Sequence, residues 1–200
     1  MYRHLKVIGD RTVAFIALIV LSPLFVAIAL WIKLDSKGPV FFKQRRIGQA
    51  KHEFQLLKFR TMKADTPSEV PTHLMTQASS YITKSGAFLR KTSLDELPQL
   101  FNVIQGTMSL VGPRPALWNQ ADLIALREAQ GVHRVKPGIT GYAQIKGRDE
   151  LPIPEKTALD AYYVTHVGFW LDIKIVLLTV IAVIRTKGVA EGDQSKKASK

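Results

Sequence analysis

Two neighbouring carboxylates, Asp95 and Glu96, lie between basic residues in the stretch of the chain best suited to chemistry. Arg90 precedes the two acids, and Arg114 follows them between two prolines. A helix cap requires neither these cations nor the rigid Gly-Pro-Arg-Pro loop at 112–115, so their presence in one short stretch favours a functional role for the two acids. The ordinary alternative for an S-x-x-E sequence is a helix cap with a purely structural role.

The same stretch has the marks of a helix. Ser93 and Glu96 stand at capping-box spacing, so we expect a helix that begins at Ser93 and holds Asp95 in its first turn. Pro98 should bend this helix just after the acids, and Gly106 lies where its end is expected. The apolar positions recur at helical spacing and predict one buried face: Leu94, Leu97, Leu100, Phe101 and Ile104.

Composition limits the class of protein. The 200 residues suffice for one domain with a buried core, and 46% of hydrophobic residues excludes a disordered chain. The net charge of +12 indicates polyanionic partners, which include nucleic acid, an anionic membrane surface and phosphorylated small molecules. The chain has no cysteine, which excludes disulfides, thiol catalysis and cysteine metal sites.

The first segment predicts contact with a membrane. Residues Thr12–Ile32 carry no charge, and about 20 such residues can cross a bilayer as a helix. Ser22 and Pro23 interrupt the run at its middle, where proline favours a break. Both flanks are basic, and basic flanks stay in the cytoplasm. A helix that enters the membrane, turns at Ser22-Pro23 and leaves on the same face satisfies both observations. A spanning helix with a proline kink is the alternative.

The rest of the chain reads as a small mixed domain. Strand-forming residues on both sides of a turn predict a hairpin within Pro39–Met62, and a polar loop follows at Ala64–Ser80. Ala121–Gln130 has the pattern of an amphipathic helix, and Asp160 begins another helical stretch. The glycines of Lys136–Arg148 indicate a loop that could bring backbone amides and an arginine to a phosphate. The apolar run Val167–Ile184 predicts a core or interfacial helix.

Several motifs in one order match a known family. They are Ser22-Pro23 in its basic-flanked apolar helix, KFRTM at 58–62, LRKTSLDELPQLFNV at 89–103, MSLVGPRP at 108–115, VKPGITGYAQIKGR at 135–148, DAYY at 160–163 and FWLDIK at 169–174. Across residues 1–188 the chain resembles the bacterial sugar transferases, specifically the small monotopic phosphoglycosyl transferases that act on polyprenyl phosphate. Two positions depart from the family pattern. Thr107 stands where relatives usually carry Asp, and Lys146 where they often carry Asn.

The resemblance implies a reaction and a set of residues. The enzyme would move a phosphosugar from a UDP-sugar to undecaprenyl (polyprenyl) phosphate with Mg²⁺, and it would release UMP. Asp95 would attack the sugar-linked phosphorus and form a covalent aspartyl-phosphosugar, with Glu96 supporting it and both acids holding the metal. The phosphate- and nucleotide-binding residues that the resemblance implies are Lys58, Arg60, Arg90, Arg114, Gln144, Arg148 and Asp172.

We therefore predict a mostly helical α+β monotopic membrane protein with a re-entrant helix, a short β-hairpin and interfacial helices. Residues 1–36 form the membrane helix, residues 37–188 the catalytic domain, and residues 189–200 a disordered tail. The catalytic domain would lie on the cytoplasmic face of the bacterial inner membrane and start the synthesis of a glycoconjugate such as an exopolysaccharide. No nucleic-acid partner is expected, and a homodimer is left open. The alternative is a non-catalytic, membrane-tethered binder of anionic lipid or nucleic acid.

Overall fold

The computed structural model describes the chain except for residues 1, 67–77, 148–150 and 185–200. Its helices are α1 (Tyr2–Asp35), α2 (Ala78–Tyr81), α3 (Lys84–Thr92), α4 (Gln99–Gln105), α5 (Ala121–Ala129), α6 (Tyr142–Lys146), α7 (Ile153–Thr165) and α8 (Phe169–Ile184). Its strands are β1 (Phe41–Ile47), β2 (Glu53–Phe59), β3 (Ser109–Val111), β4 (Ala116–Leu117) and β5 (Gly138–Thr140). The predicted mixture of helices with a short sheet is confirmed. The predicted tail at 189–200 and most of the predicted loop at 64–80 lie outside the described residues.

The predicted hairpin is the centre of the sheet. Strands β1 and β2 pair antiparallel from Phe41↔Phe59 to Ile47↔Glu53, and β4 pairs with the far end of β1. A separate parallel pair joins β3 to β5. The segment 136–147, predicted as a loop, therefore contains a strand and the short helix α6. The parallel pairing with β3, which no local pattern announces, stabilises this strand.

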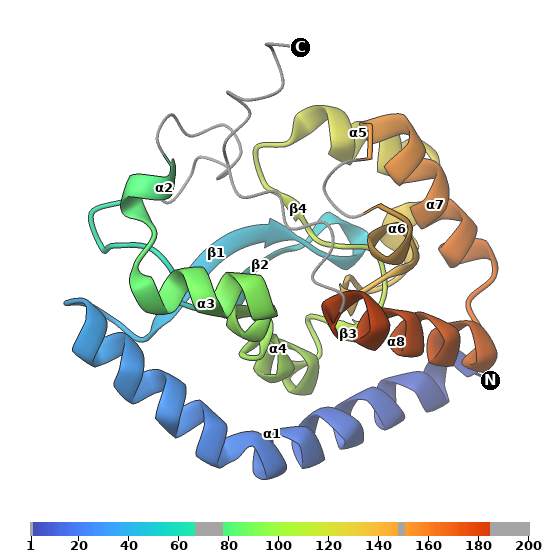
Figure 1. Cartoon of the computed structure of the whole chain (residues 1–200). Helices are drawn as coiled ribbons and strands as arrows, with labels where there is room; N and C mark the ends of the chain where they lie inside the picture. The colour runs from blue at the N-terminus through green and yellow to red at the C-terminus, as the bar shows by residue number, and fades with distance from the viewer. Residues whose placement is uncertain (1, 67–77, 148–150, 185–200) are drawn as a thin grey trace.

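Helix α1 is one continuous helix of 34 residues with Pro23 inside it. The expected interruption at Ser22-Pro23 is a bend, and Figure 1 shows the two halves of α1 inclined to each other beneath α4. The Ser22 hydroxyl donates to the carbonyl of Ile19 at 2.8 Å, a contact that often accompanies bending. Neighbouring turns supply enough hydrogen bonds for the helix to continue past the proline.

One face of α1 packs on the domain. Before the bend, Ala14 joins a core cluster with Leu56 and Val103, and after it Ile28 and Ile32 pack against Phe59 and Leu89. The other face is exposed and apolar along the middle of the helix: Val13, Phe15, Ile16, Ile19, Val20, Val26 and Leu30. Only 11% of the most apolar 18-residue stretch of α1 is buried. By length and composition α1 is long and apolar enough to cross a membrane.

Polar contacts fasten the first end of α1 to the domain. Lys6 Nζ lies 2.8 Å from Asp172 Oδ2 in α8, and the Tyr2 hydroxyl donates to the same carboxylate at 2.6 Å. Asp10 accepts a hydrogen bond from the Ser109 hydroxyl in β3. These contacts join residues about 100 or more positions apart in the sequence.

The last turn of α1 is fastened as well. Asp35 Oδ2 accepts hydrogen bonds from the backbone N–H and the hydroxyl of Ser85, both at 2.8 Å. Arg60 donates to the backbone carbonyls of Ser36 and Lys37 at 2.7 and 2.8 Å. Both ends of α1 are therefore held by the same folded domain.

Candidate active site

The backbone around the two acids differs from the predicted capped helix. Ser93 takes a left-handed conformation with φ of 57° and ends α3, and its side chain makes no capping hydrogen bond. Residues Leu94–Glu96 form a single 3-10 turn, and α4 begins only after Pro98. Proline suits the start of a helix, since its fixed φ is helical and its missing N–H is not needed there. The prediction of a capping box at Ser93 is therefore wrong. Pro98 stands at the start of a helix and does not bend one.

The two carboxylates of this turn, which we call the dyad (Asp95 and Glu96), meet cations from distant elements. Lys58 Nζ, from β2, lies 2.8 Å from Glu96 Oε1 and 3.5 Å from Asp95 Oδ2. Arg114 Nη2 lies 2.9 Å from the same Oε1 of Glu96. Asp95 is 8% exposed. A 3-10 turn of three residues has little dipole, so these cations provide most of the electrostatic stabilisation of the acids.

The environment separates the two carboxylates. Burial raises the pKa of Asp95, and Glu96 adds to that shift, while Lys58 opposes it. Burial acts on Glu96 too, but Arg114 and Lys58 outweigh it and hold the pKa of that carboxyl well below its ordinary value. Glu96 is therefore the firmly ionised partner of the cations, and Asp95 is the more basic carboxylate. Two carboxyl groups with diverging pKa values suit different roles.

Two glycine-containing segments, the Gly-Pro-Arg-Pro loop at 112–115 and the first half of the segment 136–147, lie against each other. A Cβ atom on Gly138 would come within 2.1 Å of the backbone nitrogen of Gly112, and one on Gly141 within 2.2 Å of its carbonyl oxygen. Only glycine permits such close contact between the two backbones. The contact fixes the Gly-Pro-Arg-Pro loop, and with it Arg114, against the β3–β5 pair.

Of the other predicted residues, Arg90 lies beside this centre and Gln144 is held by its own segment. The positive charge of Arg90, in α3, lowers the proton affinity of Asp95, and its Nε donates to Thr61 Oγ1 at 2.9 Å. Gln144, in α6, donates to the carbonyl of Ile139 at 3.0 Å, and its buried Oε1 has no hydrogen-bond partner among the described residues. Arg148 lies outside the described part of the chain.

Two predicted residues take part in other contacts. Arg60 is 5% exposed and holds the chain after α1, and Asp172 is 7% exposed and holds the first turns of α1. The Tyr163 hydroxyl donates to Asp172 Oδ1 at 2.8 Å, so the described structure engages both oxygens of this carboxylate. The structure thus brings together Lys58, Arg90, Asp95, Glu96 and Arg114. It pairs Asp172 with α1 and Arg60 with the chain just after α1.

Known proteins are similar to this chain over nearly all of its length. The family model described as "Bacterial sugar transferase" matches residues 1–186. The chain belongs to the bacterial sugar transferase family. Among its relatives, the UDP-glucose:undecaprenyl-phosphate glucose-1-phosphate transferases of Xanthomonas campestris pv. campestris and Escherichia coli K12 are 43% and 45% identical over 189 and 185 residues. The uncharacterized sugar transferase EpsL of Bacillus subtilis is 41% identical over 190 residues.

These alignments cover different shares of the relatives. They span 91%, 89% and 94% of this chain, in the same order. They span only 39% and 40% of the Xanthomonas and Escherichia proteins, but 91% of the Bacillus protein. The chain therefore corresponds to less than half of the two glucose-1-phosphate transferases.

The dyad offers two adjacent carboxylates as possible donors to a metal ion. No cluster of three or more His, Cys, Asp or Glu side chains is arranged for a metal in the part of the chain that is described. Mg²⁺, however, is commonly held by one or two carboxylates together with water and substrate phosphates. The adjacent carboxylates of Asp95 and Glu96 fit a magnesium ion of that kind.

Sequence reasoning missed a buried ion pair behind Arg114. Arg127, in α5, is 2% exposed and Asp160, in α7, is 1% exposed, with Arg127 Nη2 2.5 Å from Asp160 Oδ2. Arg127 looked like an ordinary surface charge of an amphipathic helix. The motif DAYY at 160–163 contained a signal, because it places an acid at the start of a motif that the family shares.

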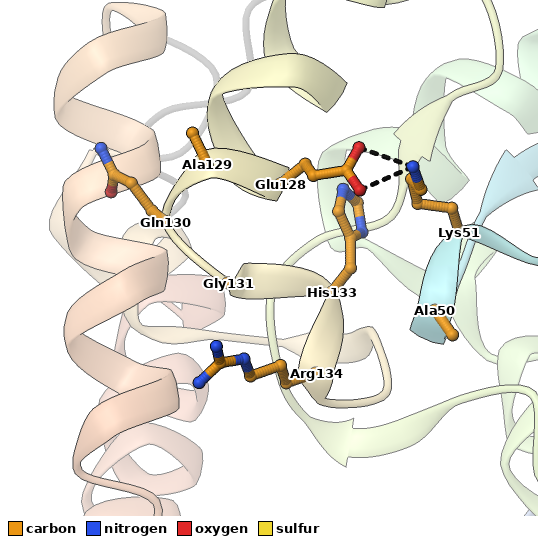
Figure 2. A pocket seen from close by; sticks show the side chains of 8 residues that line it. All are labelled: Ala50, Lys51, Glu128, Ala129, Gln130, Gly131, His133 and Arg134. Carbon is orange, nitrogen blue, oxygen red and sulfur yellow. Dashed lines mark hydrogen bonds and ion pairs between the residues drawn. The ribbon is translucent and has the colours of Figure 1, made fainter.

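A separate cavity of about 550 Å³ lies at the tip of the hairpin. Figure 2 shows the ion pair between Lys51 and Glu128, at 2.6 Å, beside His133. None of the predicted site residues that the structure describes lines this cavity. Its lining consists of Ala50, Lys51, Glu128, Ala129, Gln130, Gly131, His133 and Arg134.

Proposed function

We propose that this protein is a phosphoglycosyl transferase that moves a phosphosugar from a UDP-sugar to undecaprenyl (polyprenyl) phosphate and releases UMP. One observation carries the proposal: Lys58 and Arg114 both form ion pairs with Glu96, and Lys58 also lies near Asp95. Two cations so close together suit the diphosphate of the donor, because its negative charge must be offset before a carboxylate can attack it. The names of two relatives favour UDP-glucose as the first donor to test and an undecaprenyl-phosphate acceptor.

The proposed reaction has two displacement steps at one phosphorus atom. An Asp95 oxygen attacks the sugar-linked phosphorus, and the bond from that phosphorus to the bridging oxygen breaks, so that UMP leaves with the electron pair. A phosphate oxygen of the lipid then attacks the same phosphorus, and the bond to Asp95 breaks and restores the carboxylate. Asp95 suits the attack for two reasons. It is the more basic carboxylate, and it is less engaged by ion pairs than Glu96 is.

The other residues have supporting roles. Lys58 lies between the two carboxylates. It would bind the donor phosphates and stabilise the negative charge that moves from the Asp95 oxygen to the oxygen of the leaving UMP. Arg114 presents a planar fork suited to two phosphate oxygens, and its position between prolines limits the freedom of its backbone. Arg90, whose charge acts on Asp95 from α3, would also hold the diphosphate. Asp95 and Glu96 would hold Mg²⁺, which supplies further neutralisation of phosphate charge when bound.

We further propose that α1 is re-entrant, so that the active site faces the cytoplasmic side of the inner membrane. Support comes from the contacts that hold both ends of α1 to one domain, through Asp172 at one end and Ser85 at the other. A straight span would place these two ends on opposite sides of the bilayer. The exposed apolar faces of α1 and α8 suit burial in lipid, and Trp170 in α8, 80% exposed, suits the interface.

The function is tested by turnover. The purified chain is incubated with polyprenyl phosphate, Mg²⁺ and, in turn, UDP-glucose, UDP-galactose and UDP-N-acetylgalactosamine, and the release of UMP is measured. We expect UMP in proportion to lipid-linked phosphosugar with at least one donor, and none with Asp95→Asn. A chain that binds anionic lipid but releases no UMP with any donor would contradict the proposal and favour a non-catalytic binder.

A further inference from the structure

We propose that Arg127 and Arg46 are positioning residues that hold the main chain at Arg114 and Pro115 and so direct the Arg114 side chain at Glu96 and the donor phosphate. The proposal rests on the proposed function, because that function assigns Arg114 to the donor. It concerns side chains that contact the backbone of the loop and do not themselves touch the dyad.

The first of the two arginines links the loop to the far side of the domain. Arg127 Nη1 donates to the carbonyl of Arg114 at 2.7 Å, while its Nε and Nη2 donate to Asp160 Oδ2 at 3.0 and 2.5 Å. A guanidinium group is planar and presents its donors in fixed directions. With two donors fixed on Asp160, the third has a defined direction, and the Arg114 carbonyl lies there.

The second arginine acts from the sheet. Arg46 Nη1 donates to the carbonyl of Pro115 at 2.9 Å, and its Nε and Nη2 donate to Gln44 Oε1 at 3.1 and 2.6 Å. Arg46 also stands opposite Leu117 in the pairing of β1 with β4. The strand that follows the loop is therefore held by backbone pairing, and the carbonyl before it by a side chain.

Three successive carbonyls of the loop are held in this way, each by a different element. Pro113 accepts from the backbone N–H of Gly138 in β5 at 3.0 Å, Arg114 from Arg127 in α5, and Pro115 from Arg46 in β1. The prolines fix φ on both sides of Arg114. The backbone of Arg114 is thus held in one place, and its side chain can meet Glu96 without further ordering.

Stability alone does not account for the ion pair. Burying Arg127 and Asp160 removes two charges from water, and apolar residues of similar volume are often as stable at such positions or more so. What an apolar pair cannot supply is the donor for the Arg114 carbonyl. The cost of losing it would be felt at the dyad, since a displacement of about 1 Å can reduce a rate by about 100-fold.

A double-mutant cycle on the full chain tests the proposal. The variant Arg127→Met/Asp160→Leu replaces the ion pair with apolar side chains of similar volume. Thermal unfolding in detergent and kcat/KM for phosphosugar transfer are measured for this variant, for Arg114→Ala and for the two combined. The control Lys51→Gln/Glu128→Gln removes the exposed ion pair between the turn of the hairpin and the same helix α5, and it should keep wild-type kcat/KM.

We expect Arg127→Met/Asp160→Leu to unfold near the wild-type temperature and to lose about 10- to 100-fold in kcat/KM. In the Arg114→Ala background the same double substitution should cost less than about twofold, because there is no side chain left to direct. If this variant does not fold, Asp160→Asn takes its place in the same cycle. Losses that multiply in the combined variant, or full activity without the ion pair, would overturn the positioning role while leaving the proposed function intact. A wild-type chain without turnover would overturn both.

Discussion

Lys58 and Glu96, 38 positions apart in the sequence, form an ion pair of 2.8 Å that joins the central hairpin to the turn carrying the dyad. Lys58 stands on β2, whose pairing with β1 gives it a rigid base. The same ammonium group is 3.5 Å from Asp95. One side chain therefore links both carboxylates, and the roles of the dyad depend on its charge.

Replacing Lys58 with Met should abolish most of the activity. The substitution keeps much of the volume but removes the charge that offsets the two carboxylates, so we expect kcat/KM to fall by at least about 100-fold. The measurement is UMP release at saturating lipid acceptor. Lys63→Gln, an exposed lysine beyond the end of the same strand, is the matched control and should stay within about twofold. Activity of Lys58→Met near the wild-type value would show that the ion pair is dispensable.

Asp172→Asn should lower stability more than it lowers activity. The substitution weakens the contacts of Lys6 and Tyr2 with α8, and weakening a buried ion pair costs on the order of 3 kcal/mol. Thermal unfolding in detergent should therefore shift to lower temperature, while the KM for the UDP-sugar stays within about threefold. An unchanged unfolding temperature with a KM raised tenfold or more would assign Asp172 to the substrate.

The contact between Asp35 and Ser85 predicts a pH-dependent contribution to stability. The backbone hydrogen bond from Ser85 lowers the pKa of Asp35 below its ordinary value of 3.8. A lowered pKa means that the contact stabilises the fold above the unfolded pKa and is lost as the pH falls through the folded one. Asp35→Asn should therefore reduce the free energy of unfolding by about 1 kcal/mol at pH 7. The difference should fade as the pH drops below 3.8. A difference that persists unchanged at low pH would contradict this origin.

Both ends of α1 should be accessible from the cytoplasm only. Because the chain has no cysteine, Arg3→Cys and Lys37→Cys each introduce a unique thiol. A membrane-impermeant maleimide should label both in inverted membrane vesicles and neither in intact spheroplasts. Ser22→Ala/Pro23→Leu should shift position 3 towards labelling from outside, since it removes the bend. Labelling of position 3 from outside in the unaltered helix would refute the re-entrant path.

The sequence predicted the elements whose signals are local. The hairpin follows from strand-forming residues on both sides of a turn, and α8 follows from a continuous apolar run. The helix stop at Gly106 is confirmed by its positive φ of 86°. The dyad and its cations were grouped by motif, and the structure places Lys58, Arg90 and Arg114 around it.

Contacts between distant segments were beyond the sequence. Capping-box spacing cannot reveal that Ser93 adopts a positive φ, because its conformation depends on the packing of α3 against the turn. Asp172 and Arg60 have the residue types of ligands, but Asp172 is paired with Lys6 in α1 and Arg60 with the backbone of Ser36 just after α1. Arg127 resembles a surface charge until α7 brings Asp160 to it. Each of these groups is satisfied by a residue far away in the chain.

The most direct test of the account is the site of the covalent intermediate. The enzyme is treated with UDP-sugar in the absence of lipid acceptor, quenched and digested, and the peptide carrying residues 95 and 96 is examined by mass spectrometry. We predict a phosphosugar adduct on Asp95 that disappears on addition of polyprenyl phosphate, and no adduct in Asp95→Asn, which should retain its fold and its binding of UDP-sugar. An adduct on Glu96 or Asp172, or near wild-type turnover by Asp95→Asn, would contradict the assignment of Asp95 as the nucleophile.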